Sequence, residues 1–307
     1  MAVAFCFPGQ GSLEQGMGRD IAEAVPEAME VFERGSEACG LDLARLCFDA
    51  PLEQLVETEV QQPALVATSL AILAGLRAQG IEPDYVIGHS VGEFAALAAA
   101  EAIELEDAIA LVRERGLAMA DAARQHPGTM AAILGLADEV VENLCRKIAG
   151  VWPANYNCPG QVVVSGANAA VDEFLVEAER EGARRTVKLK VSGAFHSPLV
   201  ARAADRLKPA IDRVRVAEPV APFMSTVTAR IESAQRIRPL LVDQLTAPVK
   251  FTQSASELVR EGVRTFVEVG PGNVLSGLVK RIDRSVKAVS VNNLEGLRTI
   301  REHLPVG

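Results

Sequence analysis

The stretch Tyr85-Val86-Ile87-Gly88-His89-Ser90-Val91-Gly92-Glu93 decides the fold of this chain. Its first three residues are apolar and predict a short buried strand, and the alanine-rich run Glu93–Ala100 predicts a helix directly after it. Between them, Gly88 and Gly92 flank Ser90 in a G-x-S-x-G pattern. In this context the pattern indicates a sharp turn that projects the serine hydroxyl above the sheet. Ser90 is therefore a candidate nucleophile, with a plain loop serine as the alternative.

Strands and helices alternate on both sides of this stretch. Residues 2–7 predict a buried first strand that ends at the turn Pro8-Gly9-Gln10-Gly11-Ser12, and helical patterns continue to about residue 80. A further helix is expected over residues 106–123, and a late strand over 265–269. This alternation predicts an α/β protein with a mostly parallel sheet.

Residues 126–191 have a different organisation. The predicted strands are 129–135, 151–156, 161–166 and 184–191, and the predicted helices are 138–149 and 169–181. The resulting order, β-α-β-β-α-β, is that of a ferredoxin-like unit. We therefore expect a large α/β domain of residues 1–125 and 192–307, with a ferredoxin-like small subdomain of residues 126–191 inserted in it.

Composition limits the classes of function. The 307 residues include 31 Lys and Arg against 40 Asp and Glu, a net charge of −9, which argues against binding nucleic acid or an anionic membrane. Five scattered cysteines without a C-x-x-C motif predict reduced thiols and a cytoplasmic protein, with no metal or other cofactor. The N-terminus lacks a basic signal-peptide region, and no run of 18 apolar residues predicts a membrane span. A monomer is the default expectation.

A nucleophilic serine needs a base. The chain has four histidines: His89, His126, His196 and His303. His126 lies in an expected linker, His303 lies in a charged terminal segment, and the His89 side chain should point away from Ser90. His196 precedes Ser197, a predicted N-cap, and Pro198, a predicted first helical residue, so it occupies a loop at a helix start. His196 is the candidate base, and a hydrogen-bonded loop histidine is the alternative.

Two further features are candidates for binding. Arg115 flanks the apolar stripe of its predicted helix, and a guanidinium beside a buried face needs an anion, either a protein carboxylate or a ligand. The glycine-rich turn after the first strand lacks the spacing of a phosphate loop. It could bring the backbone N–H of Gln10 close to a reacting carbonyl, or it could be a tight turn only.

Seven segments together closely resemble malonyl-CoA:acyl carrier protein transacylases and the acyltransferase domains of polyketide synthases. In family order they are FPGQGS at 7–12, QPA at 62–64, GHSVGE at 88–93, RG at 115–116, NCPGQVVVSG at 157–166, GAFHSP at 193–198 and EVGPG at 268–272. Each segment alone is suggestive, whereas seven in order over nearly the whole chain are specific. The resemblance implies a hydrolase-like α/β domain with a ferredoxin-like insertion, in agreement with the residue patterns.

The resemblance also implies roles for individual residues. Ser90 would carry the acyl group, His196 would be its base, and Arg115 would bind the malonyl carboxylate. The backbone N–H groups of Gln10 and Val91 would form the oxyanion hole. The remaining residues expected to line the substrate pocket are Gln62, Met119, Asn157 and Phe195. A main-chain carbonyl after Pro248-Val249-Lys250 would orient His196, in a segment where many relatives have glutamine in place of Lys250.

The implied reaction is transfer of malonyl from malonyl-CoA to the phosphopantetheine thiol of acyl carrier protein, through a malonyl-serine intermediate, for fatty-acid synthesis. Ala194-Phe195-His196 implies a preference for malonyl-CoA over methylmalonyl-CoA. The alternatives are polyketide synthesis, a serine esterase or thioesterase, and a carrier-binding module without activity. A hydrolase would ordinarily need an Asp or Glu between Ser90 and His196 in the chain, and the acidic residues there are in predicted helices.

Carrier proteins are acidic, and so is this chain, so attraction requires a local basic patch. Two clusters are candidates, although basic clusters are commonly just solvated faces. The first contains Arg184, Arg185, Lys188 and Lys190, and the second contains Lys280, Arg281, Arg284 and Lys287.

Overall fold

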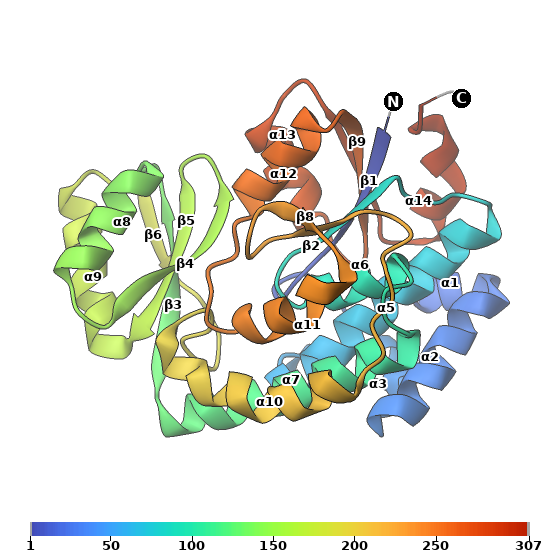
Figure 1. Cartoon of the computed structure of the whole chain (residues 1–307), viewed down its shortest axis with the longest axis horizontal. Helices are drawn as coiled ribbons and strands as arrows, with labels where there is room; N and C mark the ends of the chain where they lie inside the picture. Colours follow the sequence, from blue (N-terminus) through green and yellow to red (C-terminus); the bar gives the residue numbers. More distant parts are fainter. Residues whose placement is uncertain (1, 306–307) are drawn as a thin grey trace.

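Two β-sheets organise the protein, which we describe from a computed structural model covering residues 2–305 (Figure 1). The larger sheet has the strand order β10-β9-β1-β2-β7-β8 and is parallel except for its last pair, β7 and β8. Its strands are β1 (Ala2–Phe7), β2 (Tyr85–Gly88), β7 (Phe223–Ser225), β8 (Arg230–Glu232), β9 (Val263–Val269) and β10 (Lys287–Val291).

Both faces of the larger sheet are covered, which is why its strands are nearly continuous apolar runs. In β1, Phe5 and Phe7 pack into one core and Ala4 and Cys6 into the other. The first core is formed with helices that include α2 (Pro26–Cys39), α5 (Thr58–Ala78), α6 (Gly92–Ala99), α7 (Leu105–Gln125) and α10 (Ala201–Arg213). The second is formed with α12 (Phe251–Arg260) and α13 (Val274–Ile282).

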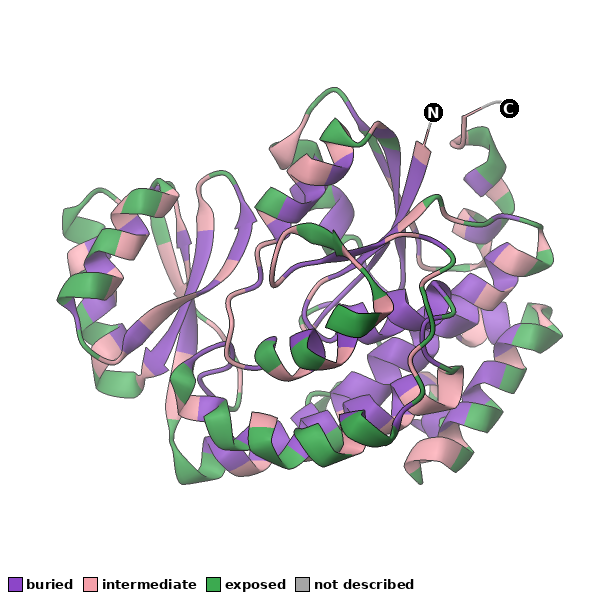
Figure 2. Ribbon diagram, in the orientation of Figure 1, coloured by how far each residue is buried: buried purple, intermediate pink, exposed green. Residues whose placement is uncertain are grey.

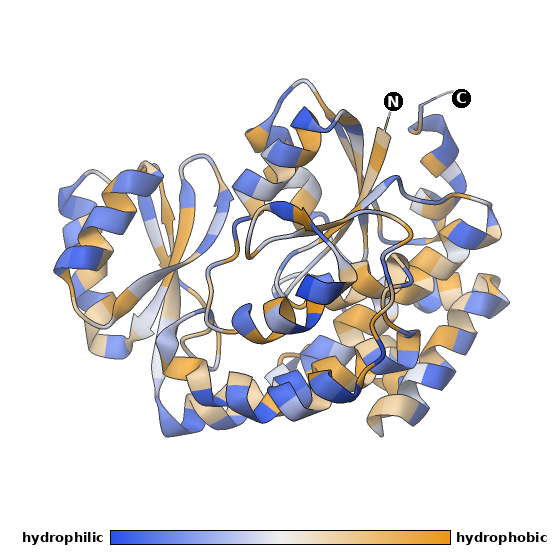
Figure 3. Cartoon of the chain, in the orientation of Figure 1, coloured by the Kyte–Doolittle hydropathy of each residue, from blue (hydrophilic) through white to orange (hydrophobic). Residues whose placement is uncertain are grey.

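The shorter helices lie around this framework. They are α1 (Arg19–Ala24), α3 (Leu43–Phe48), α4 (Leu52–Leu55), α11 (Ala234–Asp243) and α14 (Leu294–Thr299), with 3-10 turns at Pro198–Val200 and Ile300–Glu302. Burial is highest in β1, β2, β7 and β9 and in α5 and α6, and the outer helices expose one side (Figure 2). The hydropathy of the residues follows the same division, with apolar residues at the centre and polar residues outside (Figure 3).

The smaller sheet is antiparallel, with strand order β4-β5-β3-β6. Its elements follow the chain as β3 (Gly128–Leu134), α8 (Asp138–Lys147), β4 (Val151–Cys158), β5 (Gln161–Ala167), α9 (Asn168–Arg180) and β6 (Arg185–Lys188). Val141 of α8 and Phe174 of α9 pack with Val162 and Val164 in a separate core. The predicted β-α-β-β-α-β order and the α/β fold class are confirmed.

The structure differs from the predicted elements in two respects. The last strand of the small sheet was expected over 184–191 and ends at Lys188 instead. Leu189 still donates its N–H to Met130 O at 2.9 Å, but the chain then turns to Ser192, whose hydroxyl hydrogen-bonds Thr58 Oγ1 at 2.8 Å. Strands β7, β8 and β10 were not among the predicted strands. For β7 and β8 the reason is length, since each has three residues and carries no periodic pattern.

The register of β1 and β2 positions the site. Phe7 pairs with Gly88, and the His89 N–H donates to Phe7 O at 2.9 Å, so the turns after both strands lie at the same carboxyl edge of the sheet. Ligands bind at this edge in open α/β folds. Helix α6 begins so close to β1 that a Cβ on Gly92 would lie 2.1 Å from Phe7 O.

We predict that Gly92→Ala destabilises the protein, because β1 or α6 must shift to admit the methyl group. The expected loss is about 3 kcal/mol in the free energy of unfolding, measured by chemical denaturation. Gly277→Ala is the matched control: it lies within α13, and its added Cβ would meet no heavy atom within 4 Å. The control should be neutral or gain up to about 1 kcal/mol from helix propensity. Equal stabilities of the two variants would contradict the prediction.

Candidate active site

Ser90 occupies a strained turn between β2 and α6. Its φ of 54° lies in the left-handed region, which non-glycine residues rarely adopt. The flanking glycines are required by space, since a Cβ on Gly88 would lie 2.2 Å from the Glu93 backbone nitrogen. The turn therefore has the form of a nucleophile elbow, in which strain is held by the packing on either side.

The Ser90 hydroxyl contacts His196. Ser90 Oγ lies 2.8 Å from His196 Nε2, and both residues are buried. His196 Nδ1 lies 2.9 Å from Gln244 O and 3.1 Å from Ala247 O. Carbonyl oxygens only accept hydrogen bonds, so Nδ1 carries the proton and Nε2 is free to accept the Ser90 proton.

The carbonyls that orient His196 correct one expectation. They belong to Gln244 and Ala247, which precede Pro248-Val249-Lys250 rather than follow it. The chain leaves α11 at Gln244 and brings these carbonyls toward His196 before it reaches α12. Lys250 is the N-cap of α12, and its N–H donates to Thr226 O at 2.7 Å, so its backbone is directed at the β7 end of the sheet.

His196 is held as a neutral imidazole. Burial, followed by the positive charge of Arg115 and the neighbouring His89, lowers the pKa of His196 to about 3, and the two carbonyl hydrogen bonds only partly oppose this. His196 itself has a φ of 57°, and Ser197 caps the 3-10 turn after it by accepting the Leu199 N–H. The predicted helix start at Ser197-Pro198 is confirmed.

Arg115 reaches the same hydroxyl from α7. Its side chain is 0% exposed, with Nη2 donating to Ser90 Oγ at 3.0 Å and Nη1 donating to Gln62 Oε1 at 2.7 Å. Burial lowers the pKa of Arg115 to about 10, and the charge of Glu93 opposes the shift, so the guanidinium stays protonated at neutral pH. Gln62 Nε2 in turn donates to Met119 Sδ at 3.4 Å. Ser90, His196, Arg115, Gln62 and Met119 thus form one connected cluster.

The other predicted residues lie around this cluster. Asn157 Oδ1 is 2.9 Å from His89 Nε2, so Asn157 holds the ring of His89 and has no hydrogen bond to Ser90. Phe195 is buried in the large core beside His196. Asn157 and Phe195 therefore flank the cluster and lie outside its hydrogen-bond network.

Gln10 and Val91 lie at the turn after β1 and at the start of α6. Gly9 is so near the elbow that a Cβ there would lie 2.5 Å from His89 O. Gln10 Nε2 donates to Gln61 Oε1 at 2.7 Å. Within residues 2–305, the backbone N–H groups of Gln10 and Val91 donate to no protein acceptor. They can therefore donate to a ligand.

Sequence reasoning did not single out Glu93 and Gln244. Glu93 Oε2 accepts a hydrogen bond from Gln244 Nε2 at 2.5 Å. A signal for Glu93 was available, because it is the only acid in the apolar run Gly92–Ala99. No signal existed for Gln244, since every residue has a carbonyl and only the fold brings this one to His196.

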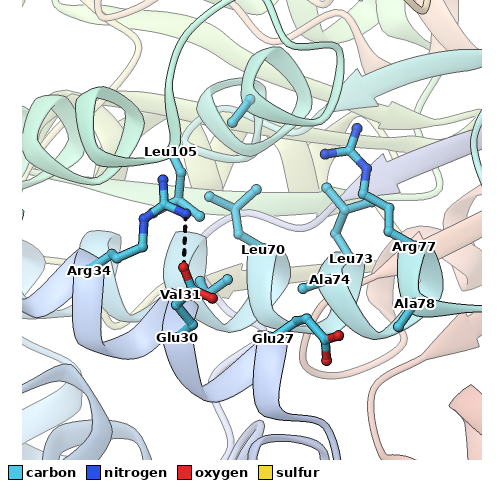
Figure 4. Close-up of a pocket in the computed structure, with 11 residues that line it drawn as sticks. Glu27, Glu30, Val31, Arg34, Leu70, Leu73, Ala74, Arg77, Ala78 and Leu105 are labelled. Atoms are coloured by element: carbon cyan, nitrogen blue, oxygen red, sulfur yellow. Dashed lines mark hydrogen bonds and ion pairs between the residues drawn. The ribbon is translucent and has the colours of Figure 1, made fainter.

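A separate hollow of about 340 Å³ lies between α2, α5 and the start of α7 (Figure 4). Its floor is apolar, and its two arginines already have carboxylate partners: Arg34 with Glu106 at 2.6 Å and Arg77 with Glu82 at 3.1 Å. None of its lining residues belongs to the cluster at Ser90. In the part of the chain that the structure describes, no three His, Cys, Asp or Glu side chains gather to hold a metal ion, and no helix is long and apolar enough to cross a membrane.

A serine at a strand–helix elbow, hydrogen-bonded to a buried neutral histidine, is the arrangement of enzymes that transfer acyl groups through serine. The family described as the acyl transferase domain matches residues 4–303. The chain belongs to this family and is an acyltransferase.

Individual relatives match over nearly the whole chain. The malonyl CoA-acyl carrier protein transacylase of Bacillus subtilis is 41% identical over 309 residues, covering 98% of each chain. The solved structure of the malonyl CoA-acyl carrier protein transacylase from Coxiella burnetii is 37% identical, with a TM-score of 0.96 over 99% of this chain and 98% of that one. A malonyl-transacylase solved in complex with its type II polyketide synthase acyl-carrier protein is 38% identical, with a TM-score of 0.95 over 99% and 100%.

Proposed function

We propose that this protein transfers a malonyl group from malonyl-CoA to the phosphopantetheine thiol of an acyl carrier protein through a malonyl-Ser90 intermediate. The observation that carries the proposal is the double contact of Ser90 Oγ, 2.8 Å from the His196 base and 3.0 Å from the Arg115 guanidinium. A nucleophile with a fixed cation beside it suits an acyl group that carries a second, negatively charged end. The names of the relatives support the same substrates.

In the first half-reaction, Ser90 Oγ attacks the thioester carbonyl as its proton moves to His196 Nε2. The oxyanion accepts hydrogen bonds from the N–H groups of Gln10 and Val91, and loss of one such donor typically costs about 10²–10³ in rate. The C–S bond then breaks, and CoA leaves with the proton from His196. In the second half-reaction the carrier thiol gives its proton to His196 and attacks the serine ester, which restores the Ser90 hydroxyl. The cycle is ping-pong.

Arg115 selects the acyl group. In malonyl-serine the free carboxylate is only two carbons from the ester oxygen, and a guanidinium that contacts Ser90 Oγ suits this short spacing. The planar fork of arginine binds a carboxylate with two parallel hydrogen bonds. Gln62 fixes the fork through Nη1, and Met119 fixes Gln62 in turn. Phe195, buried beside His196, and Val91 beside Ser90 crowd the α-carbon, which favours malonyl-CoA over methylmalonyl-CoA.

A serine hydrolase is the weaker candidate. A hydrolase triad has a carboxylate at the histidine Nδ1, whereas His196 Nδ1 faces two main-chain carbonyls. We further propose that residues 126–191 act as a subdomain beside the Ser90 cluster, which Asn157 joins to His89, and that the protein is a cytoplasmic monomer of fatty-acid synthesis. The five free thiols support a reducing compartment such as the cytoplasm.

The carrier protein is proposed to dock on cationic side chains around the β4–β5 hairpin. Arg281 Nη1 donates to Gln161 Oε1 at 2.7 Å, and Gln161 and Arg185 both pair with Leu134 of β3. Members of both predicted basic clusters therefore meet here. We call this the hairpin surface: Arg184, Arg185, Lys280, Arg281 and Arg284, all exposed. The hairpin leads to Asn157, which holds His89 beside Ser90, whereas Lys188 is paired with Asp172.

Incubation with malonyl-CoA alone should add one malonyl group to the enzyme, detected by intact-mass spectrometry. Ser90→Ala should remain unmodified, because it has no nucleophile. Without carrier protein, release of CoA should stall near one equivalent, whereas a hydrolase would continue to turn over. An adduct that persists in Ser90→Ala, or continued turnover, would refute the proposed function.

Arg115→Ala should reduce kcat/KM for malonyl-CoA about 100-fold, the order expected when one partner of a buried charge pair is lost. Its kcat/KM for acetyl-CoA should fall less, so the malonyl-to-acetyl ratio decreases. Arg113→Ala, on the same helix and bonded to Glu59 O at 2.6 Å, is the control and should leave the ratio unchanged. The assay is steady-state transfer with both donors, and an unchanged ratio in Arg115→Ala would contradict the assignment.

Combined charge reversal, Arg185→Glu with Arg281→Glu, should raise the KM for carrier protein about tenfold at low salt, because steering by complementary charge is lost. The rate of Ser90 acylation by malonyl-CoA should be unchanged. Arg298→Glu, exposed on α14 away from the hairpin surface, is the control (Figure 1). If the KM for carrier protein does not change, the hairpin surface is not the docking site.

A further inference from the structure

Glu93 is a buried carboxylate in the first turn of α6, on a helix that is otherwise apolar. It is 1% exposed and accepts three hydrogen bonds. Oε1 accepts from the Thr226 N–H at 2.6 Å and the Thr226 hydroxyl at 2.9 Å, and Oε2 accepts from Gln244 Nε2 at 2.5 Å. The reaction described above makes no use of this group.

Gln244 connects Glu93 to the base. Its side chain donates to Glu93, and its own carbonyl accepts the proton on His196 Nδ1 at 2.9 Å. Gln244 is the C-cap residue of α11, so its carbonyl lies where the helix ends. The amide side chain anchored on α6 thus fixes the backbone that orients His196. The nucleophile and the anchor of its base then lie on the same elbow, three residues apart.

This carboxylate is expensive to bury. Burial raises the pKa of Glu93 to about 7, while its three hydrogen bonds and the positive charge of Arg115 favour the ionised form. An apolar side chain of similar size would avoid the desolvation cost. If Glu93 only joined α6 to the loop after α11, it would therefore stabilise the fold less than an apolar side chain would. Besides joining α6 to this loop, the carboxylate accepts hydrogen bonds from Thr226 and Gln244 at the same time, which an apolar side chain could not do.

We propose that Glu93 is a positioning residue for the proton transfer, acting through Gln244 to hold the His196 imidazole in line with Ser90 Oγ. This inference rests on the proposed function, in which His196 is the base. Glu93 itself contacts neither substrate nor the reacting atoms. Its acceptor oxygens fix Gln244, Gln244 O fixes the Nδ1 proton, and the Nε2 lone pair then faces the Ser90 hydroxyl.

The test uses Glu93→Gln and Gln244→Met, each in the full chain and each also combined with His196→Ala. In Glu93→Gln the charge is removed and one acceptor oxygen is replaced by an NH₂, so the side chain can no longer accept from Thr226 and Gln244 Nε2 at the same time, while the volume is kept. Gln244→Met removes the donor and leaves the backbone carbonyl. Thr226→Val is the matched control, because it removes one donor to the same carboxylate without touching Gln244. The measured quantity is the rate constant of Ser90 acylation, by rapid quench and intact-mass spectrometry.

We expect Glu93→Gln and Gln244→Met each to slow acylation about 10- to 100-fold, the usual range for groups that orient a functional histidine. The loss should be the same with malonyl-CoA and acetyl-CoA, because the substitutions leave the contacts of Arg115 with the malonyl carboxylate unchanged. The KM should change little. Thr226→Val should lose less than about threefold, because the Thr226 backbone N–H still donates to Glu93 Oε1 and the contact with Gln244 is unchanged. In the His196→Ala background neither substitution should slow acylation further, because groups that act as a unit are not additive.

The possible failures are distinguishable. If His196→Ala acylates at the wild-type rate, the proposed function itself is wrong. His196→Ala is expected to acylate slowly. If Glu93→Gln or Gln244→Met slows it further, by the factor seen in the chain that retains His196, the effect is structural and the positioning role is overturned. If Glu93→Gln does not fold, as judged by its thermal unfolding, Gln244→Met decides the question by the same criterion.

Discussion

At Gly92, helix α6 passes so near the Phe7 carbonyl that no side chain fits between them. This contact fixes the start of α6 against the end of β1, and the turn between β2 and α6 must then hold Ser90 at a positive φ. The hydroxyl leaves the sheet at its carboxyl edge, beside the turn that carries Gln10. The strain of a left-handed serine is of order 1–2 kcal/mol, and the packing of β1, β2 and α6 sustains it.

The electrostatics of the site follow from the burial of its ionisable groups. Burial lowers the pKa of both His196 and Arg115, and the consequence differs for the two groups. The imidazole is left neutral, which suits a base, whereas the guanidinium has so high an ordinary pKa that it keeps its charge. Glu93, in the first turn of the helix that follows Ser90, raises the pKa of Arg115 against this shift. The turn at Ser90 and the first turn of α6 therefore carry both the nucleophile and the counter-charge of the group that would bind the substrate.

The two sheets meet at the site through β4. Asn155 of β4 forms a bridge with Val249, and Asn157 binds the ring of His89. The small sheet thereby reaches both the elbow and the segment after Gln244 that orients His196. A carrier protein docked at the β4–β5 hairpin would lie close to the residues that the acyl group must reach.

The sequence alone determined the strand–turn–helix at Ser90, the β-α-β-β-α-β unit and the helix start at Ser197, because these depend on local periodicity, small residues and capping. It also identified Ser90, His196 and Arg115, since a motif in family order specifies residue types. Only the tertiary structure decided that Gln244 and Ala247 orient His196, that Glu93 anchors Gln244, and that the two basic clusters meet at one hairpin. Main-chain carbonyls are present at every position and carry no signal in the residue types. Contacts between residues 151 positions apart, such as Glu93 and Gln244, exist only after the chain has packed.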